Sequence, residues 1–239
     1  MRLLVCSFAG IVAASILISV FSGPANAEFS GAFELGPSGC EAKGECTLTY
    51  DLNYVDANGV GWQAAAKDKT DGASIPAWAQ PFIGNPFDKS YIKAAIMHDH
   101  YCDRHVRSWR ATHRVFYDAL LELGVEPAKA KLMYYAVYLA GPKWVTLIPG
   151  KPCGDNCLFR VDGEGAKNAN ASKEITITRP AEYDKAGFTE ELKQVEALLK
   201  EHAAEVDLAA LEKRAQDRKA GDFYYKNGDT VQIGKDAAE

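Results

Sequence analysis

Apolar and polar residues alternate with a period of two in the segment that follows residue 28. The runs 47–55 and 60–63 are rich in β-branched and aromatic residues, and Asn58-Gly59 between them is typical of a hairpin turn. The pattern predicts a small antiparallel sheet within residues 29–67.

The period then changes from two to that of a helix. Apolar residues recur at helical spacing and predict helices over residues 90–105, 108–123 and 127–140. We expect Ser90 to cap the first of these helices and Gly124 to end the second. The sheet and the three helices predict an α+β domain over residues 28–150, with the sheet packed against a catalytic-like core of three helices.

The C-terminal third has a different composition. Residues 151–188 are rich in glycine and asparagine and predict a loop-rich connector, with one strand at 175–178. Residues 189–219 carry a narrow apolar stripe, which predicts one long helix packed on its own domain rather than on a coiled-coil partner. Residues 189–239 thus form a C-terminal helix and tail, and 235–239 are expected to be loose.

The N-terminus has the pattern of a secretory signal peptide. An apolar stretch over residues 3–21 is followed by Ala25-Asn26-Ala27, the small-residue pattern at which signal peptidase cleaves. Residues 1–27 are therefore predicted to be removed, which makes the mature protein periplasmic or secreted, with no retained transmembrane segment. A retained anchor is the alternative, because the stretch nearly reaches the length that spans a bilayer.

Five cysteines follow the predicted signal peptide. Their grouping suggests two short disulfide loops, Cys40 with Cys46 and Cys153 with Cys157, although other pairings remain open. Cys102 is then left over, and we interpret it as a buried thiol. The net charge of −5 and the isoelectric point near 5.6 argue against a nucleic-acid partner.

Two short motifs have residue types that core packing does not require. They are the hexapeptide Asp71-Gly72-Ala73-Ser74-Ile75-Pro76 and the doublet His98-Asp99. Four of the five histidines lie within residues 98–113, so titratable or metal-binding chemistry is expected there. His98 and Cys102 are four residues apart and should share one helix face.

Other donors must come from outside this helix. We expect Asp71 in the fixed loop and His113 on the next helix to join His98 and Asp99. Weaker candidates complete the set: Ser74, Arg104 and Asp118.

Each candidate also has a purely structural interpretation. Asp71 would cap a turn, His113 would be a hydrogen-bonded core residue, and Asp99 would pair with Arg104 or Arg107. His100 is expected to be exposed.

The motifs resemble a known family. The segments that carry the resemblance are Thr70-Asp71-Gly72-Ala73-Ser74-Ile75-Pro76, Ala94-Ala95-Ile96-Met97-His98-Asp99 and His113-Arg114-Val115-Phe116-Tyr117-Asp118-Ala119-Leu120. In this order they closely resemble domain-of-unknown-function family 1353 of phages and bacteria, over about residues 60–144. The resemblance implies no settled activity, and this chain has Thr112-His113 where many relatives carry an Ala-Asp pair.

A more distant likeness is to the helical His-Asp doublet of phospholipase A2. It implies that His98 deprotonates water while Asp99 binds calcium, with Asp71 replacing a missing ligand. Zinc bound by His98, His113 and either Asp99 or Asp71 is the rival metal site. Phosphohydrolases of the HD type are set aside because no histidine precedes His98.

These observations favour an exported hydrolase that acts on a cell-envelope component, with a His/Asp site that a divalent metal, zinc or calcium, assists. The expected substrate is a phospholipid ester or a peptidoglycan bond. The alternative is a noncatalytic periplasmic binding or assembly protein, in which the motifs only stabilise the fold.

Overall fold

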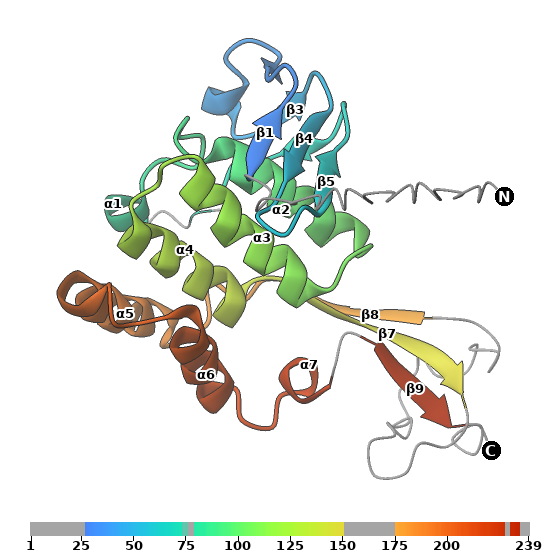
Figure 1. The fold of residues 1–239 in the computed structure, drawn as a ribbon, viewed down its shortest axis with the longest axis vertical. Coiled ribbons are helices and arrows are strands. Elements are labelled where there is room, and N and C mark those ends of the chain that lie inside the picture. The colour runs from blue at the N-terminus through green and yellow to red at the C-terminus, as the bar shows by residue number, and fades with distance from the viewer. Residues whose placement is uncertain (1–26, 74, 76–78, 151–174, 228–229, 235–239) are drawn as a thin grey trace, which may run out of the picture.

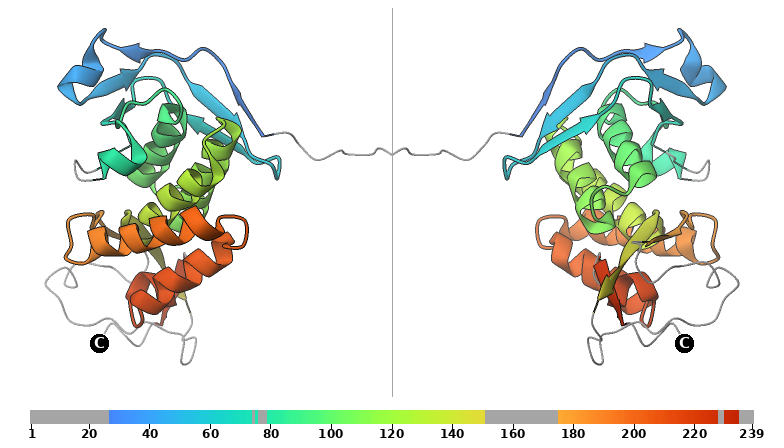
Figure 2. Two further views of the ribbon diagram at one scale, coloured as in Figure 1. Left: turned by 90° about the vertical axis from the view of Figure 1, so that its left-hand side faces the viewer. Right: turned by 90° about the vertical axis from the view of Figure 1, so that its right-hand side faces the viewer.

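The computed structural model describes residues 27–73, 75, 79–150, 175–227 and 230–234. The N-terminal strands lie on one side of three central helices, and the C-terminal helices lie on the opposite side (Figures 1 and 2). The predicted α+β class is confirmed. The predicted signal peptide falls outside the described residues, apart from Ala27. Among the described residues, none of the helices has the length and apolar character needed to cross a membrane.

The N-terminal strands form two small antiparallel sheets rather than one. The first sheet has the order β1 (Glu28–Ser30), β4 (Leu52–Val55), β5 (Gly61–Ala64), and the second has the order β2 (Leu35–Gly36), β3 (Cys46–Leu48), β6 (Lys69–Thr70). The predicted hairpin joins β4 to β5, and Gly59 at its tip has a φ of 77°. The Asp56 carboxylate accepts hydrogen bonds from the backbone N–H groups of Asn58 and Val60 and so fixes this turn.

A disulfide joins Cys40 and Cys46, as the cysteine spacing predicts. Cys40 begins the short 3-10 helix η1 (Cys40–Lys43), and Cys46 begins β3. In the β3–β6 register Cys46 lies opposite Thr70, so the disulfide braces the strand that leads into the hexapeptide. Cys153 and Cys157 lie outside the described residues.

The three predicted helices are present as α2 (Ile92–Arg104), α3 (Trp109–Glu122) and α4 (Pro127–Ala140), after a short α1 (Gln80–Ile83). Ser108 caps α3 by accepting a hydrogen bond from Ala111, and Gly124 follows its end with a φ of 78°. The prediction that Ser90 caps α2 is wrong. The Ser90 hydroxyl donates to Asp88 at 2.7 Å, and α2 begins two residues later.

The predicted long C-terminal helix is two helices, α5 (Phe188–His202) and α6 (Leu208–Arg218). Asp207 starts α6 by accepting a hydrogen bond from the Ala210 N–H, which separates the two helices. Both pack on α4, so the predicted packing on the same chain is confirmed. With α3 on one side and these helices on the other, α4 is buried almost all round, as its apolar composition requires.

A third sheet has the order β8 (Ile175–Arg179), β7 (Lys143–Gly150), β9 (Thr230–Gly234), and β9 runs parallel to β7. Figure 1 shows this sheet extending away from the central helices, with α7 (Phe223–Lys226) beside it. Strand β8 confirms the strand expected at 175–178. The Trp144 indole N–H donates to the Arg107 carbonyl at 2.7 Å and so holds the base of β7 against the α2–α3 connection.

Candidate functional site

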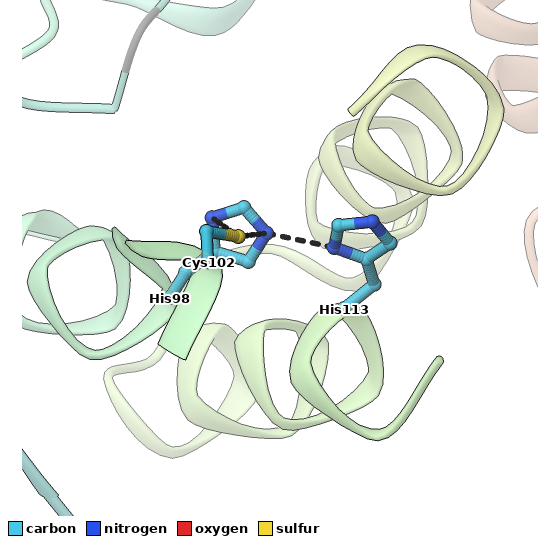
Figure 3. Close-up of side chains that lie close together, drawn as sticks. All are labelled: His98, Cys102 and His113. Atoms are coloured by element: carbon cyan, nitrogen blue, oxygen red, sulfur yellow. Dashed lines mark hydrogen bonds between the residues drawn. The ribbon is translucent and has the colours of Figure 1, made fainter. Parts of the chain in front are cut away.

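Helices α2 and α3 bring three metal-ligating side chains together. His98 and Cys102 share a face of α2, and His113 faces them from α3 (Figure 3). The His98 Nε2 lies 2.8 Å from the His113 Nδ1, and the Cys102 Sγ lies 3.5 Å from the same His98 nitrogen. All three side chains are buried, so the packing of the helices fixes their geometry.

The hydrogen bonds define which nitrogen of each histidine carries the proton. The His113 Nε2–H donates to the Pro142 carbonyl at 3.0 Å, because a carbonyl can only accept. The neutral His113 therefore has its lone pair on Nδ1 and accepts from the His98 Nε2–H. This arrangement leaves the His98 Nδ1 as an acceptor, 3.8 Å from the Asp99 Oδ1.

Burial keeps His113 and Cys102 uncharged. It lowers the pKa of His113 well below its usual value, and the neighbouring His98 and Lys143 side chains act in the same direction. Burial also raises the pKa of the Cys102 thiol, with the carboxylates of Asp99 and Asp103 adding to the effect. The thiol is thus protonated and is no free nucleophile at neutral pH.

The hexapeptide loop positions Asp99 through Thr70. The Thr70 hydroxyl donates to the Asp99 Oδ2 at 3.0 Å and accepts from the Gly72 N–H at 3.0 Å. Gly72 has a φ of 88°, and a Cβ there would lie 2.6 Å from the Pro86 carbonyl oxygen. Only glycine fits this close approach, so Gly72 fixes the backbone in the first part of the hexapeptide.

Asp99 lies in a partly dry environment. Burial raises the pKa of its carboxyl group, and the nearby Asp71 contributes to the rise, while the neighbouring His98 imidazole and the hydrogen bond from Thr70 oppose it. The Asp99 carboxylate is therefore more basic than that of an exposed aspartate.

A cavity of about 410 Å³ opens beside these groups. It is lined by Glu45, Lys69, Thr70, Asp71, Ala73, Ala95, His98, Asp99, Cys102, Asp103, Phe116, Val137, Pro142, Ala181 and Tyr183. His98 and Cys102 are 6% and 8% exposed, whereas His113 is 0% exposed and does not line the cavity. The structure thus brings Asp71, His98 and Asp99 into one hollow, whereas His113 contacts His98 without reaching the hollow itself.

The weaker candidates lie elsewhere. The Arg104 guanidinium donates to Asp68 at 2.8 Å, and the Asp118 carboxylate pairs with Arg114 at 3.5 Å; neither residue lines the cavity. Burial raises the pKa of Asp118, and the charge of Arg114 opposes this rise. Ser74 lies outside the described residues.

Two structural expectations are corrected. Arg107 donates to the Gly61 carbonyl at 3.0 Å, and Arg104 pairs with Asp68, so the described contacts do not pair Asp99 with either arginine. His100 is not exposed, because it is half-buried and its Nδ1 bonds to the Asp68 carboxylate.

Sequence reasoning missed three contributors. Thr70 adjoins the hexapeptide, and Cys102 shares the His98 face, so both had a positional signal. Tyr183, between β8 and α5, had none, yet its ring reaches the cavity. Burial raises the pKa of the Tyr183 hydroxyl, and the neighbouring Cys102, Asp99 and Asp71 side chains raise it further. The lining of the cavity thus includes a neutral phenol.

Comparison with known families agrees with the motif resemblance. Residues 46–137 match the family described as Protein of unknown function (DUF1353). The match includes the hexapeptide, the His98-Asp99 doublet and His113, so the predicted resemblance is confirmed over this region. The likeness to phospholipase A2 stays a hypothesis that rests on the doublet alone.

The chain is similar to two uncharacterized proteins of Sinorhizobium fredii (strain NBRC 101917 / NGR234). It is 49% identical to y4iH over 154 residues, which cover 64% of this chain and 61% of that protein. It is 39% identical to y4jT over 122 residues, which cover 49% of this chain and 36% of that protein. The chain thus spans less than two thirds of either relative. No solved structure matches it significantly.

Proposed function

We propose that this protein is an exported hydrolase that acts on a component of the cell envelope. The observation that carries the proposal is the shared cavity of His98, Asp99 and Asp71, which are held by a helix and by a glycine-dependent loop. Preorganised groups of this kind are typical of catalytic sites rather than of packing.

The groups on the cavity wall suit hydrolysis. Attack by water on a carbonyl needs one group that activates the water and another that accepts its proton. The His98 imidazole would activate the water, and the carboxylates of Asp99 and Asp71 would accept its proton. The proton that a carboxylate takes from water would pass to the leaving group when the bond breaks, which completes the reaction without an outside reagent.

The charge of the cavity favours one of the two expected substrates. Its lining has four carboxylates and one ammonium group, Lys69, which already pairs with Glu45 at 2.8 Å. A negative lining repels an anionic phosphate headgroup and accepts neutral or cationic groups. We therefore favour an amide bond of peptidoglycan over a phospholipid ester.

Two features support action outside the cytoplasm. The N-terminal sequence has the pattern of a signal peptide, and Cys40 and Cys46 form a disulfide. Disulfides persist in oxidising compartments such as the periplasm.

The test is turnover by the purified chain from Glu28 onward. Peptidoglycan and phospholipid vesicles would be assayed separately with the wild type, His98→Ala and, as a matched control, Asp118→Asn. We expect new amine groups from peptidoglycan with the wild type and with Asp118→Asn, and none with His98→Ala. Equal turnover by the wild type and His98→Ala would contradict the proposal. Retained binding of peptidoglycan without turnover of either substrate would favour the noncatalytic alternative.

A further inference from the structure

We propose that His98, Cys102 and His113 bind one zinc ion, with His98 Nε2, Cys102 Sγ and His113 Nδ1 as the ligand atoms. This set differs from the carboxylate-containing site that the sequence suggests, because a thiolate takes the place of Asp99 or Asp71. The catalytic use of the ion rests on the proposed function, whereas its binding does not.

The spacing of the three atoms fits a tetrahedral zinc site. They all lie within 4.8 Å of one another. Zinc bonds of about 2.0–2.1 Å to nitrogen and about 2.3 Å to sulfur place neighbouring ligand atoms about 3.3–3.6 Å apart. The 3.5 Å between Cys102 Sγ and His98 Nε2 already meets this distance. The two nitrogens, 2.8 Å apart, need only separate slightly when the proton between them leaves.

The outer partners of both histidines also match a metal site. Zinc-bound histidines usually donate their second N–H to a carbonyl or a carboxylate, which orients the ring. The His113 Nε2–H already donates to the Pro142 carbonyl. The His98 Nδ1 lies 3.8 Å from the Asp99 carboxylate, which would accept an N–H from this atom.

The protons balance when the ion binds. The His98 proton moves from Nε2 to Nδ1, beside Asp99, so this histidine stays neutral. Cys102 loses its thiol proton to solvent and binds as a thiolate. One proton is therefore released for each zinc ion, and the buried site keeps a single net positive charge.

The ligand types favour zinc over calcium. Thiolate and imidazole are ligands of soft or borderline ions, whereas calcium takes oxygen ligands. The other described group with metal-ligand spacing, Cys40, Glu41 and Cys46, is not available because its two sulfurs form the disulfide.

The site leaves one coordination position, and two of its ligands lie on the cavity wall. His98 and Cys102 both line the cavity, while His113 closes the site from behind. A bound zinc ion would make a water in this cavity more acidic, and Asp71 and Asp99, which also line the cavity, would accept its proton. The resulting hydroxide would add to the substrate carbonyl carbon, the bond to the leaving nitrogen would break, and the protonated Asp71 or Asp99 would return the proton to that nitrogen.

Metal binding tests the site without any substrate. Chelator-treated chain would be titrated with zinc and, separately, with cobalt(II), and compared with Cys102→Ser, His113→Ala and the surface control His202→Ala. We expect one zinc per chain in the wild type and in His202→Ala, and affinity at least about 100-fold weaker in the site variants. Cobalt should give a sulfur-to-metal charge-transfer band that Cys102→Ser lacks.

Two outcomes would overturn the site. One is zinc affinity in Cys102→Ser equal to that of the wild type, and the other is cobalt binding without the sulfur band. If His113→Ala does not fold, the nearly isosteric Cys102→Ser still decides. Zinc bound as described by a protein without hydrolytic activity would contradict the proposed function alone. Full hydrolytic activity of the zinc-free chain would contradict only the catalytic use of the ion.

Discussion

The two opposite faces of α2 place histidines in contrasting surroundings. On the face toward the sheet, His100 bonds to Asp68, and Arg104 donates to the same carboxylate at 2.8 Å. On the face toward the cavity, His98 contacts His113 and Cys102, which are both uncharged. On the first face one carboxylate bonds to both the His100 imidazole and the Arg104 guanidinium. On the second face three potential metal ligands converge on one another.

This difference separates a structural role from a chemical one. Ion pairs such as Asp68 with Arg104 hold strands and helices together. Two imidazoles and a thiol are buried side by side at this position. Apolar residues would pack there with less cost of burial. Their convergence beside a cavity is therefore the feature that needs a functional explanation.

The largest expected effect concerns activity. His98→Ala removes the group that activates water and should lower the hydrolysis rate by at least about 100-fold. Asp68→Asn alters only the opposite face of α2 and should leave the rate within about twofold of the wild type, a range typical of changes that do not touch the reaction. Initial rates on peptidoglycan measure both variants. An equally large loss of rate in Asp68→Asn and His98→Ala would contradict the assignment of different roles to the two faces of α2.

Gly72→Ala tests the cavity face of α2 from the loop that lies against it, because Thr70, Asp71 and Ala73 beside Gly72 line the same cavity. A Cβ at this position would meet the Pro86 carbonyl, and the positive φ adds strain. We expect the free energy of unfolding to fall by about 2 kcal/mol or more. Urea denaturation measures it, with Gly187→Ala as the control, because Gly187 also has a positive φ but no neighbour within 4 Å of the added Cβ. An equal loss in both variants would show that the close approach has no effect.

Thr70→Val tests whether the loop positions Asp99. The substitution keeps the shape of the side chain but removes the hydroxyl that joins Gly72 to Asp99. We expect a loss of about tenfold in turnover, which corresponds to the loss of roughly one hydrogen bond to a charged group. The exposed Thr176→Val is the control. An unchanged rate in Thr70→Val would remove Thr70 from the set of positioning residues.

The smallest effect concerns the outer face. Asp68→Asn weakens the contacts to His100 and Arg104 and should lower the free energy of unfolding by about 1 kcal/mol. The exposed pair of Lys213 and Asp217 gives the control, since Asp217→Asn should produce no measurable change. Thermal unfolding of both variants checks this. A stability of Asp68→Asn equal to that of the wild type would contradict a structural role for this face.

The sequence predicts the local part of the fold well. The helices at 92–104, 109–122 and 127–140 follow from helical spacing and from capping residues, which act within a few positions of one another. The break between α5 and α6 was missed because the apolar stripe continues across it, and only Asp207 signals the new start. Strand β9 was missed because it pairs with β7, more than 80 positions earlier, and no local pattern encodes such pairing.

The sequence indicated which side chains of the candidate site lie near one another, but not how deeply each is buried. Helical spacing showed that His98 and Cys102 share a face, and the loop motif indicated Asp71. Spacing alone does not show that His113 lies behind His98, because that depends on how α2 and α3 pack. Tyr183 reaches the cavity through the placement of the β8–α5 segment, which has no motif of its own.

X-ray absorption spectroscopy of the zinc-loaded chain tests most directly whether the cavity face of α2 is a metal site. Zinc bound by His98, Cys102 and His113 should show one sulfur ligand at about 2.3 Å and two imidazole nitrogens at about 2.0–2.1 Å, with one further light atom. A first shell of nitrogen and oxygen atoms alone would contradict it.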